Sequence, residues 1–134
     1  LASRLGCEIA IVDKRRPKAG ESEVMNIVGD VSGRRCILVD DICDSGGTLC
    51  NAAEALKAKG ATAVSAYVTH GVFSRNAIQR IEGSELDEVV ACDTIRPRDE
   101  DLESDKLRIL TVAPLLGEAI RRIANKESVS KLFD

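Results

Sequence analysis

Residues 36–49 read Cys36-Ile-Leu-Val-Asp40-Asp-Ile-Cys-Asp-Ser45-Gly-Gly-Thr-Leu49. The stretch begins with a short run of aliphatic and β-branched residues, which is typical of a buried strand. Two adjacent glycines then allow the backbone to turn sharply. Apolar residues recur with helical spacing at positions 49, 52, 53 and 56. A buried strand that turns at glycines directly into a helix indicates the βα unit of a parallel α/β sheet.

The same alternation of strand and helix extends along the rest of the chain. Short apolar runs predict further strands at 8–12, 63–68, 88–92 and 108–112, and apolar stripes predict helices around 77–81 and 116–123. We therefore expect a doubly wound, mostly parallel sheet flanked by helices, with ligands beyond the carboxyl ends of the strands. Residues 23–31 predict an extended arm or hairpin off this sheet, and the acidic stretch 96–105 predicts a solvated loop.

Composition sets the size and class of the protein. The chain has 134 residues, 44% of them hydrophobic, which suits one α/β domain over residues 1–134. A net charge of -3 argues against nucleic-acid binding. No apolar run approaches the roughly 20 residues of a membrane span, so we expect a cytoplasmic protein. Because the sequence opens without Met, we also expect that it is part of a longer chain.

The five cysteines form no Cys-x-x-Cys pair and have no His partner at metal-like spacing. We expect them to be reduced and mostly buried. Cys43 lies inside the glycine loop and could act as a nucleophile, but no nearby residue resembles its base. A structural role for Cys43 is therefore favoured.

The glycine loop has the chemistry of a phosphate cradle. Backbone N–H groups at adjacent glycines and the N-terminus of the following helix attract an anion. Ser45 and Thr48 can add hydroxyl donors. Asp40 and Asp41 would repel phosphate, so we expect them to accept from sugar hydroxyls or to bind Mg²⁺. The alternative is an ordinary capped turn without a ligand.

Residues 40–48 resemble the phosphoribosyl-binding loop shared by type I phosphoribosyltransferases and ribose-phosphate pyrophosphokinases. The surrounding segments 13–17, 23–30, 69–74, 93–95 and 127–133 are similar to the pyrophosphokinases, in order along the chain. The resemblance implies a type I phosphoribosyltransferase-like domain from the C-terminal half of such an enzyme, with the N-terminal half and the first part of this domain preceding residue 1. Arg75 and Arg96 depart from the family pattern, outside the loop.

The resemblance also implies roles for individual residues. Lys14 and Arg16 would be catalytic residues on a mobile loop, and Arg16 would also contact ribose 5-phosphate. Asp41 would be a supporting carboxylate, and Ser128 and Ser130 would line a regulatory phosphate site. The remaining expected contacts to ribose 5-phosphate are Asp40, Asp44, Ser45, Gly46, Gly47 and Thr48.

The implied reaction transfers the diphosphoryl group of ATP to ribose 5-phosphate, giving phosphoribosyl pyrophosphate and AMP. The implied cofactor is Mg²⁺, with ligands mostly upstream and none expected here, and the implied assembly is a homo-oligomer, a hexamer at full length. The alternatives are a type I phosphoribosyltransferase, which would consume phosphoribosyl pyrophosphate, and a non-catalytic synthase-associated subunit. For His70, the one histidine, a structural hydrogen bond is favoured over a role as base.

Overall fold

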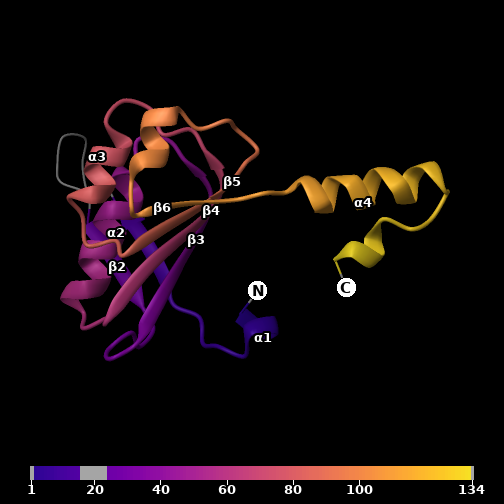
Figure 1. Cartoon of the computed structure of the whole chain (residues 1–134). Helices are drawn as coiled ribbons and strands as arrows, with labels where there is room; N and C mark the ends of the chain where they lie inside the picture. Colours follow the sequence, from indigo (N-terminus) through magenta and orange to yellow (C-terminus); the bar gives the residue numbers. More distant parts are fainter. Residues whose placement is uncertain (1, 16–23, 134) are drawn as a thin grey trace.

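The protein, seen here in a computed structural model, is described for residues 2–15 and 24–133 (Figure 1). The elements in chain order are α1 (Ala2–Leu5), β1 (Ile11–Arg15), β2 (Val24–Val28), β3 (Arg35–Cys43), α2 (Gly47–Ala58), β4 (Ala63–Gly71), α3 (Ala77–Glu82), β5 (Glu88–Cys92), the 3-10 helix η1 (Asp99–Glu103), β6 (Leu107–Leu110), α4 (Ala113–Ala124) and the 3-10 turn η2 (Ser130–Leu132).

The main sheet contains four parallel strands in the order β3-β4-β5-β6. Parallel crossovers are almost always right-handed. Because every crossover here steps in the same direction, the helices that follow β3 and β4 must lie on one face, and Figure 1 shows α2 and α3 on the same side of the sheet. The predicted parallel α/β sheet with helices is confirmed, and its described strands follow chain order without the reversal of a doubly wound sheet.

The core fills the space between this sheet and the two helices. The buried side chains of the strands are small and aliphatic, as in Val64 and Val89, while Leu56 of α2 and Ile81 of α3 close the other side. Phe73, just after β4, is the aromatic residue of the core and is 2% exposed. On the opposite face of the sheet Ile37 and Val39 of β3 are exposed, since no crossover helix covers them.

The first predicted strand is wrong in position and in partner. We expected residues 8–12 in the main sheet, whereas β1 begins at Ile11 and pairs antiparallel with β2 in a separate two-stranded sheet. The ladder from Ile11↔Val28 to Arg15↔Val24 fixes this register. The prediction of an extended arm or hairpin off the main sheet at 23–31 is confirmed for Val24–Val28, which is one strand of this separate sheet.

Strands β3 and β4 are longer than predicted. The ladder between β3 and β4 continues through Ile42↔His70 and Cys43↔Gly71. Asp40 and Asp41 are therefore residues of the strand itself. Strands β5 and β6 lie close to the predicted 88–92 and 108–112.

The predicted solvated loop at 96–105 is mostly exposed, but it contains η1 and a buried carboxylate. Asp101 is 3% exposed and accepts from Arg98 Nε at 2.9 Å and Arg98 Nη2 at 2.8 Å. Arg98 Nη2 also donates to Phe73 O at 3.3 Å. This ion pair ties η1 to the loop after β4, which the acidic composition did not indicate.

Helix α4 has the predicted amphipathic pattern but extends away from the sheet (Figure 1). Its apolar residues Leu116, Ile120 and Ile123 are exposed. Glu118 and Arg122, four residues apart, form an ion pair on this helix, with 2.7 Å between Oε1 and Nε. None of the helices in residues 2–15 and 24–133 is both long and apolar enough to span a bilayer.

Candidate functional site

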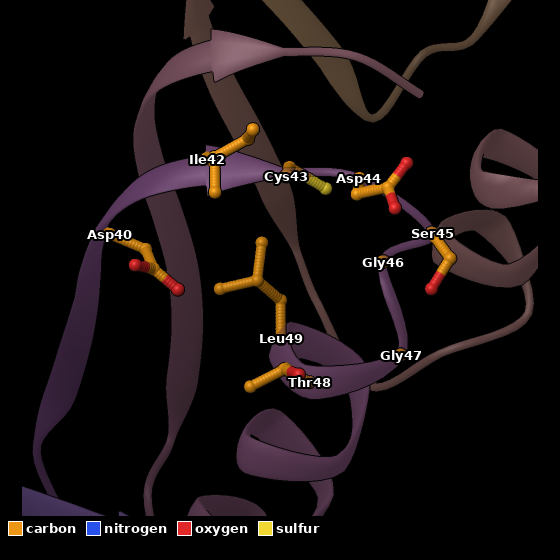
Figure 2. Close-up of a pocket in the computed structure, with 9 residues that line it drawn as sticks. All are labelled: Asp40, Ile42, Cys43, Asp44, Ser45, Gly46, Gly47, Thr48 and Leu49. Carbon is orange, nitrogen blue, oxygen red and sulfur yellow. The ribbon is translucent and has the colours of Figure 1, made fainter. Parts of the chain in front are cut away.

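A hollow of about 310 Å³ lies where β3 turns into α2 (Figure 2). It is built from one continuous stretch of chain, residues 40–49, which contains the predicted phosphate cradle. Figure 2 shows Asp40 facing the start of the helix, with Asp44 and Ser45 on the turn. The lining residues are Asp40, Ile42, Cys43, Asp44, Ser45, Gly46, Gly47, Thr48 and Leu49.

The turn depends on Gly46, whose φ of 75° lies in the left-handed region that favours glycine. Gly46 is the N-cap of α2, and its carbonyl accepts from Cys50 N at 3.0 Å. The helix then begins at Gly47, so its positive N-terminal end points at the hollow. Backbone amides at a glycine turn and a helix N-terminus form an anion site of the size of a phosphate group.

The loop carbonyls accept hydrogen bonds from outside this stretch of chain. All four donors come from the segment after β4 and from α3. The bonds run from Val72 N to Cys43 O (2.9 Å), Phe73 N to Cys43 O (3.2 Å), Ser74 N to Asp44 O (3.0 Å) and Arg80 Nη1 to Ser45 O (2.6 Å). Arg80 was not predicted, because one Arg within a short helical stripe carries no signal that it reaches a distant loop.

The two neighbouring carboxylates are not equivalent. Asp40 lines the hollow, whereas Asp41 does not, because successive residues of a strand point to opposite faces. Asp40 Oδ1 also accepts from Asp41 N at 2.9 Å. Asp40 is therefore the carboxylate that lines the hollow, and the backbone amide of Asp41 holds it by a hydrogen bond.

The described part of the chain holds no group of three or more His, Cys, Asp or Glu side chains that could bind a metal ion. Asp40 and Asp41 diverge, so they do not offer Mg²⁺ two converging carboxylates. A Mg²⁺ ion at this hollow would keep most of its shell as water or substrate oxygens, as Mg²⁺ commonly does.

Of the two predicted catalytic residues, Lys14 belongs to β1. Lys14 pairs with Met25 in the backbone ladder. Arg16 lies outside the described residues. The structure thus gives the backbone position of Lys14. The expected roles of Lys14 and Arg16 stay predictions.

Ser128 and Ser130 follow α4 and do not line the hollow. Their hydroxyl oxygens are 2.7 Å apart, and Arg122 Nη1 donates to Ser128 O at 3.0 Å. The segment is thereby fastened to the end of α4. The expected regulatory site remains a prediction.

His70 makes the hydrogen bond favoured for it. Thr94 Oγ1 donates its one hydrogen to Thr69 O at 2.9 Å, so the 2.8 Å contact between Thr94 Oγ1 and His70 Nδ1 requires a proton on Nδ1. Cys43 is 1% exposed, and burial, followed by neighbouring Cys50, raises its thiol pKa to about 11. Such a thiol is a poor nucleophile, which fits the structural role.

The chain is similar to known proteins over its whole length. It is 67% identical to the ribose-phosphate pyrophosphokinase of Hyphomonas neptunium and 59% identical to that of Agrobacterium fabrum, covering 100% of this chain and 43% of each relative. The chain thus spans less than half the length of these relatives.

A solved structure shares the fold. The crystal structure of phosphoribosylpyrophosphate synthetase from Mycobacterium smegmatis matches with a TM-score of 0.82 and 36% identity, over 93% of this chain and 40% of that one. The family of phosphoribosyl synthetase-associated domains matches residues 8–134. The chain therefore belongs to the family of phosphoribosyl synthetase-associated domains.

Proposed function

We propose that this chain forms the ribose 5-phosphate-binding domain of a ribose-phosphate diphosphokinase, corresponding to the C-terminal half of that enzyme. In the proposed reaction the anomeric hydroxyl of ribose 5-phosphate attacks the β-phosphorus of ATP. A bond forms between that oxygen and the β-phosphorus, and the bond from the β-phosphorus to the oxygen of the α-phosphate breaks. The hydroxyl proton is lost, and the products are phosphoribosyl pyrophosphate and AMP.

The observation that carries this proposal is the hollow lined by residues 40–49. Its glycine turn and helix N-terminus suit the 5-phosphate, while Asp40 on the strand suits the sugar hydroxyls. Amide donors on the turn and a carboxylate acceptor on the strand would thus suit the phosphate and the hydroxyls of one sugar phosphate. The names of the relatives agree with this substrate.

The proposed roles follow from charge. Asp44, Ser45, Gly46, Gly47 and Thr48 hold the 5-phosphate through amides and hydroxyls, and Asp40, with Asp41 behind it, orients the ribose. Diphosphoryl transfer needs positive charge around the transferring phosphorus more than it needs covalent help. Lys14 would supply that charge, and Arg16 would share it between the transferring group and ribose 5-phosphate.

The complete enzyme would need more than this chain. Mg²⁺ would neutralise charge on the phosphates of ATP, with ligands mostly from the rest of the enzyme. We expect a homo-oligomer, a hexamer at full length, and the exposed apolar side chains of α4 are suited to contacts outside this domain. Since ATP and ribose 5-phosphate are cytoplasmic metabolites, the proposal places the enzyme in the cytoplasm.

An NMR titration of the 134-residue chain tests the binding site. Ribose 5-phosphate is expected to shift the amide signals of residues 44–48 and of Asp40. Inorganic phosphate should shift 44–48 without Asp40, and ribose should leave 44–48 unchanged. Shifts confined to residues outside 40–48 would contradict the proposed site.

A chimera tests the reaction. In it the chain replaces the matching part of the Hyphomonas neptunium relative, and AMP release from ATP and ribose 5-phosphate is measured. Turnover that depends on both substrates supports a diphosphokinase. Consumption of phosphoribosyl pyrophosphate with a nucleobase, without AMP release from ATP, would instead indicate a phosphoribosyltransferase.

A further inference from the structure

We propose that Arg80 is a positioning residue for the phosphate site, because it holds the carbonyl of Ser45 turned away from the bound anion. The inference rests on the proposed function, since it concerns the same cradle. Arg80 belongs to α3, which is distant in sequence from the loop, and its guanidinium Nη1 donates to Ser45 O at 2.6 Å.

The bond from Arg80 fixes the orientation of the peptide group between Ser45 and Gly46. A peptide whose oxygen points one way has the N–H of the next residue pointing the other way. Fixing Ser45 O against Arg80 therefore also fixes the direction of the Gly46 N–H, which donates to Cys43 in the lining of the hollow. A carbonyl that rotated into the cradle would present a partial negative charge to the phosphate.

Neighbouring carbonyls are held in the same way. Cys43 O and Asp44 O accept from backbone amides of residues 72–74 at 2.9 to 3.2 Å. Ser45 is the next position along the loop, and there the donor is the guanidinium of Arg80. Arg80 thus completes a series of three bound carbonyls, and it is the member of the series that a side-chain substitution can remove.

Arg80 extends from a packed helix that lies close to the glycines. Ala77, Ile78 and Ile81 of α3 are buried, and Cys50 Sγ of α2 lies 3.8 Å from Arg80 O. A Cβ built on Gly47 would lie 3.4 Å from Arg80 Nη1. The guanidinium therefore places a fixed positive charge against the glycine turn, as well as a hydrogen bond.

The test is a titration of the folded chain with ribose 5-phosphate and with inorganic phosphate, followed by NMR. Arg80→Gln and Arg80→Met remove the charge, and Arg80→Lys keeps the charge without the planar guanidinium. Arg35→Gln is the matched control, because it removes an equal charge at the other end of β3. Thermal unfolding of each variant reports on the fold separately.

We expect Arg80→Gln and Arg80→Met to weaken both ligands about tenfold, Arg80→Lys to restore most of that loss, and Arg35→Gln to bind as the parent does. The signals of residues 45–47 should shift in the two neutral variants before any ligand is added. A folded Arg80→Gln chain with parental affinity would overturn the inference while leaving the cradle itself in place.

Other outcomes are equally decisive. Equal losses in Arg80→Gln and Arg35→Gln would reduce the effect to net charge and overturn the positioning role. Unfolding of both neutral variants would show that Arg80 is required for folding, and it would also overturn the positioning role. If the parent chain bound both ligands away from residues 44–48, the proposed function itself would fail, which is distinguishable from failure of the Arg80 role.

Discussion

At the scale of single residues, the two adjacent glycines of the cradle make different demands. Gly46 has a left-handed backbone, whereas Gly47 does not, and a Cβ on Gly47 would meet Arg80 Nη1 at 3.4 Å and Ser45 Oγ at 3.9 Å. These contacts are tolerable in a folded chain. Gly47 therefore serves the close approach of a ligand, and Gly46 serves the turn.

Gly47→Val is accordingly expected to abolish ribose 5-phosphate binding while the chain stays folded, because the branched side chain fills the phosphate position. Calorimetry and thermal unfolding measure the two effects. Gly46→Ala is the comparison, and it should cost about 1 kcal/mol of stability because Ala disfavours positive φ. Unchanged affinity in a folded Gly47→Val chain would contradict the cradle.

Gly71 has a packing role of a different kind. A Cβ there would lie 2.4 Å from Phe73 Cε2 and 3.1 Å from Ala91 Cβ. Gly71→Ala should therefore lower the free energy of unfolding by about 2 kcal/mol, measured by urea unfolding, because the buried Phe73 ring must move. Gly117→Ala, which meets nothing within 4 Å in α4, is the control and should not destabilise the chain. Equal stability of the two variants would contradict this close packing.

Lys14 belongs to the proposed reaction. In the chimera, Lys14→Ala should lower kcat by two to three orders of magnitude, roughly the effect of removing one charge contact in a transition state. The KM for ribose 5-phosphate should change little. A collapse of ribose 5-phosphate affinity with turnover retained at saturation would make Lys14 a binding residue.

At the scale of the elements, the sequence predicted what local patterns determine. The strand and helix around residues 36–56 were predicted because their apolar spacing and glycine turn are local signals. The extension of β3 through Cys43 was not, since it depends on pairing with His70 and Gly71. The burial of Asp101 was not predicted, because it depends on a tertiary contact: Arg98 binds both Asp101 and the carbonyl of Phe73, which is distant in sequence.

The candidate site divides in the same way. Residues 40–48 were predicted because chain order alone brings strand, turn and helix together. Arg80 was missed because its contact with Ser45 crosses between two βα units. The separation of Asp40 from Asp41 follows from the unexpected length of β3, which sends them to opposite faces.

Helix α4 offers a pH test of its surface ion pairs. Hydrogen bonds from Arg121 and Arg122 lower the pKa of Glu118 from 4.5 to about 2. A lowered folded-state pKa gives stability that is present above pH 4.5 and lost as the pH falls through about 2. The helicity of α4, followed by NMR, should therefore decline over this range, and Glu118→Gln should remove this part of the pH dependence. An identical acid profile in both chains would contradict it.

At the scale of the whole molecule, the sheet has one covered face and one exposed face. Helices α2 and α3 lie on the covered face together with the loop after β4, whereas Ile37 and Val39 lie exposed on the other (Figure 1). The cradle is local to one βα unit and to the segment that supports it. We expect the proposed cradle to form without the rest of a longer enzyme.

We therefore expect the 134-residue chain to bind ribose 5-phosphate weakly and to release no AMP from ATP plus ribose 5-phosphate, because the chain spans 43% of its relatives and the proposed ATP site needs the remainder. A coupled AMP assay measures this, with the chimera as the positive control. Turnover by the chain alone would contradict the expectation that the ATP site lies in the rest of the enzyme, and it would place ATP binding within these 134 residues.

The chain-order arrangement of β3, β4 and β5 also bears on how the protein forms during translation. Each new strand joins the edge left by the one before it, so no strand must wait for a later segment to be inserted between existing neighbours. The chain emerges from the ribosome N-terminus first, and contacts between segments close in sequence form fastest. The glycine turn, its carbonyl donors and Arg80 all precede Cys92, the end of β5. A nascent chain that has emerged through β5 would therefore already contain every residue of the proposed cradle and its supporting donors, before β6 and α4 have been synthesised.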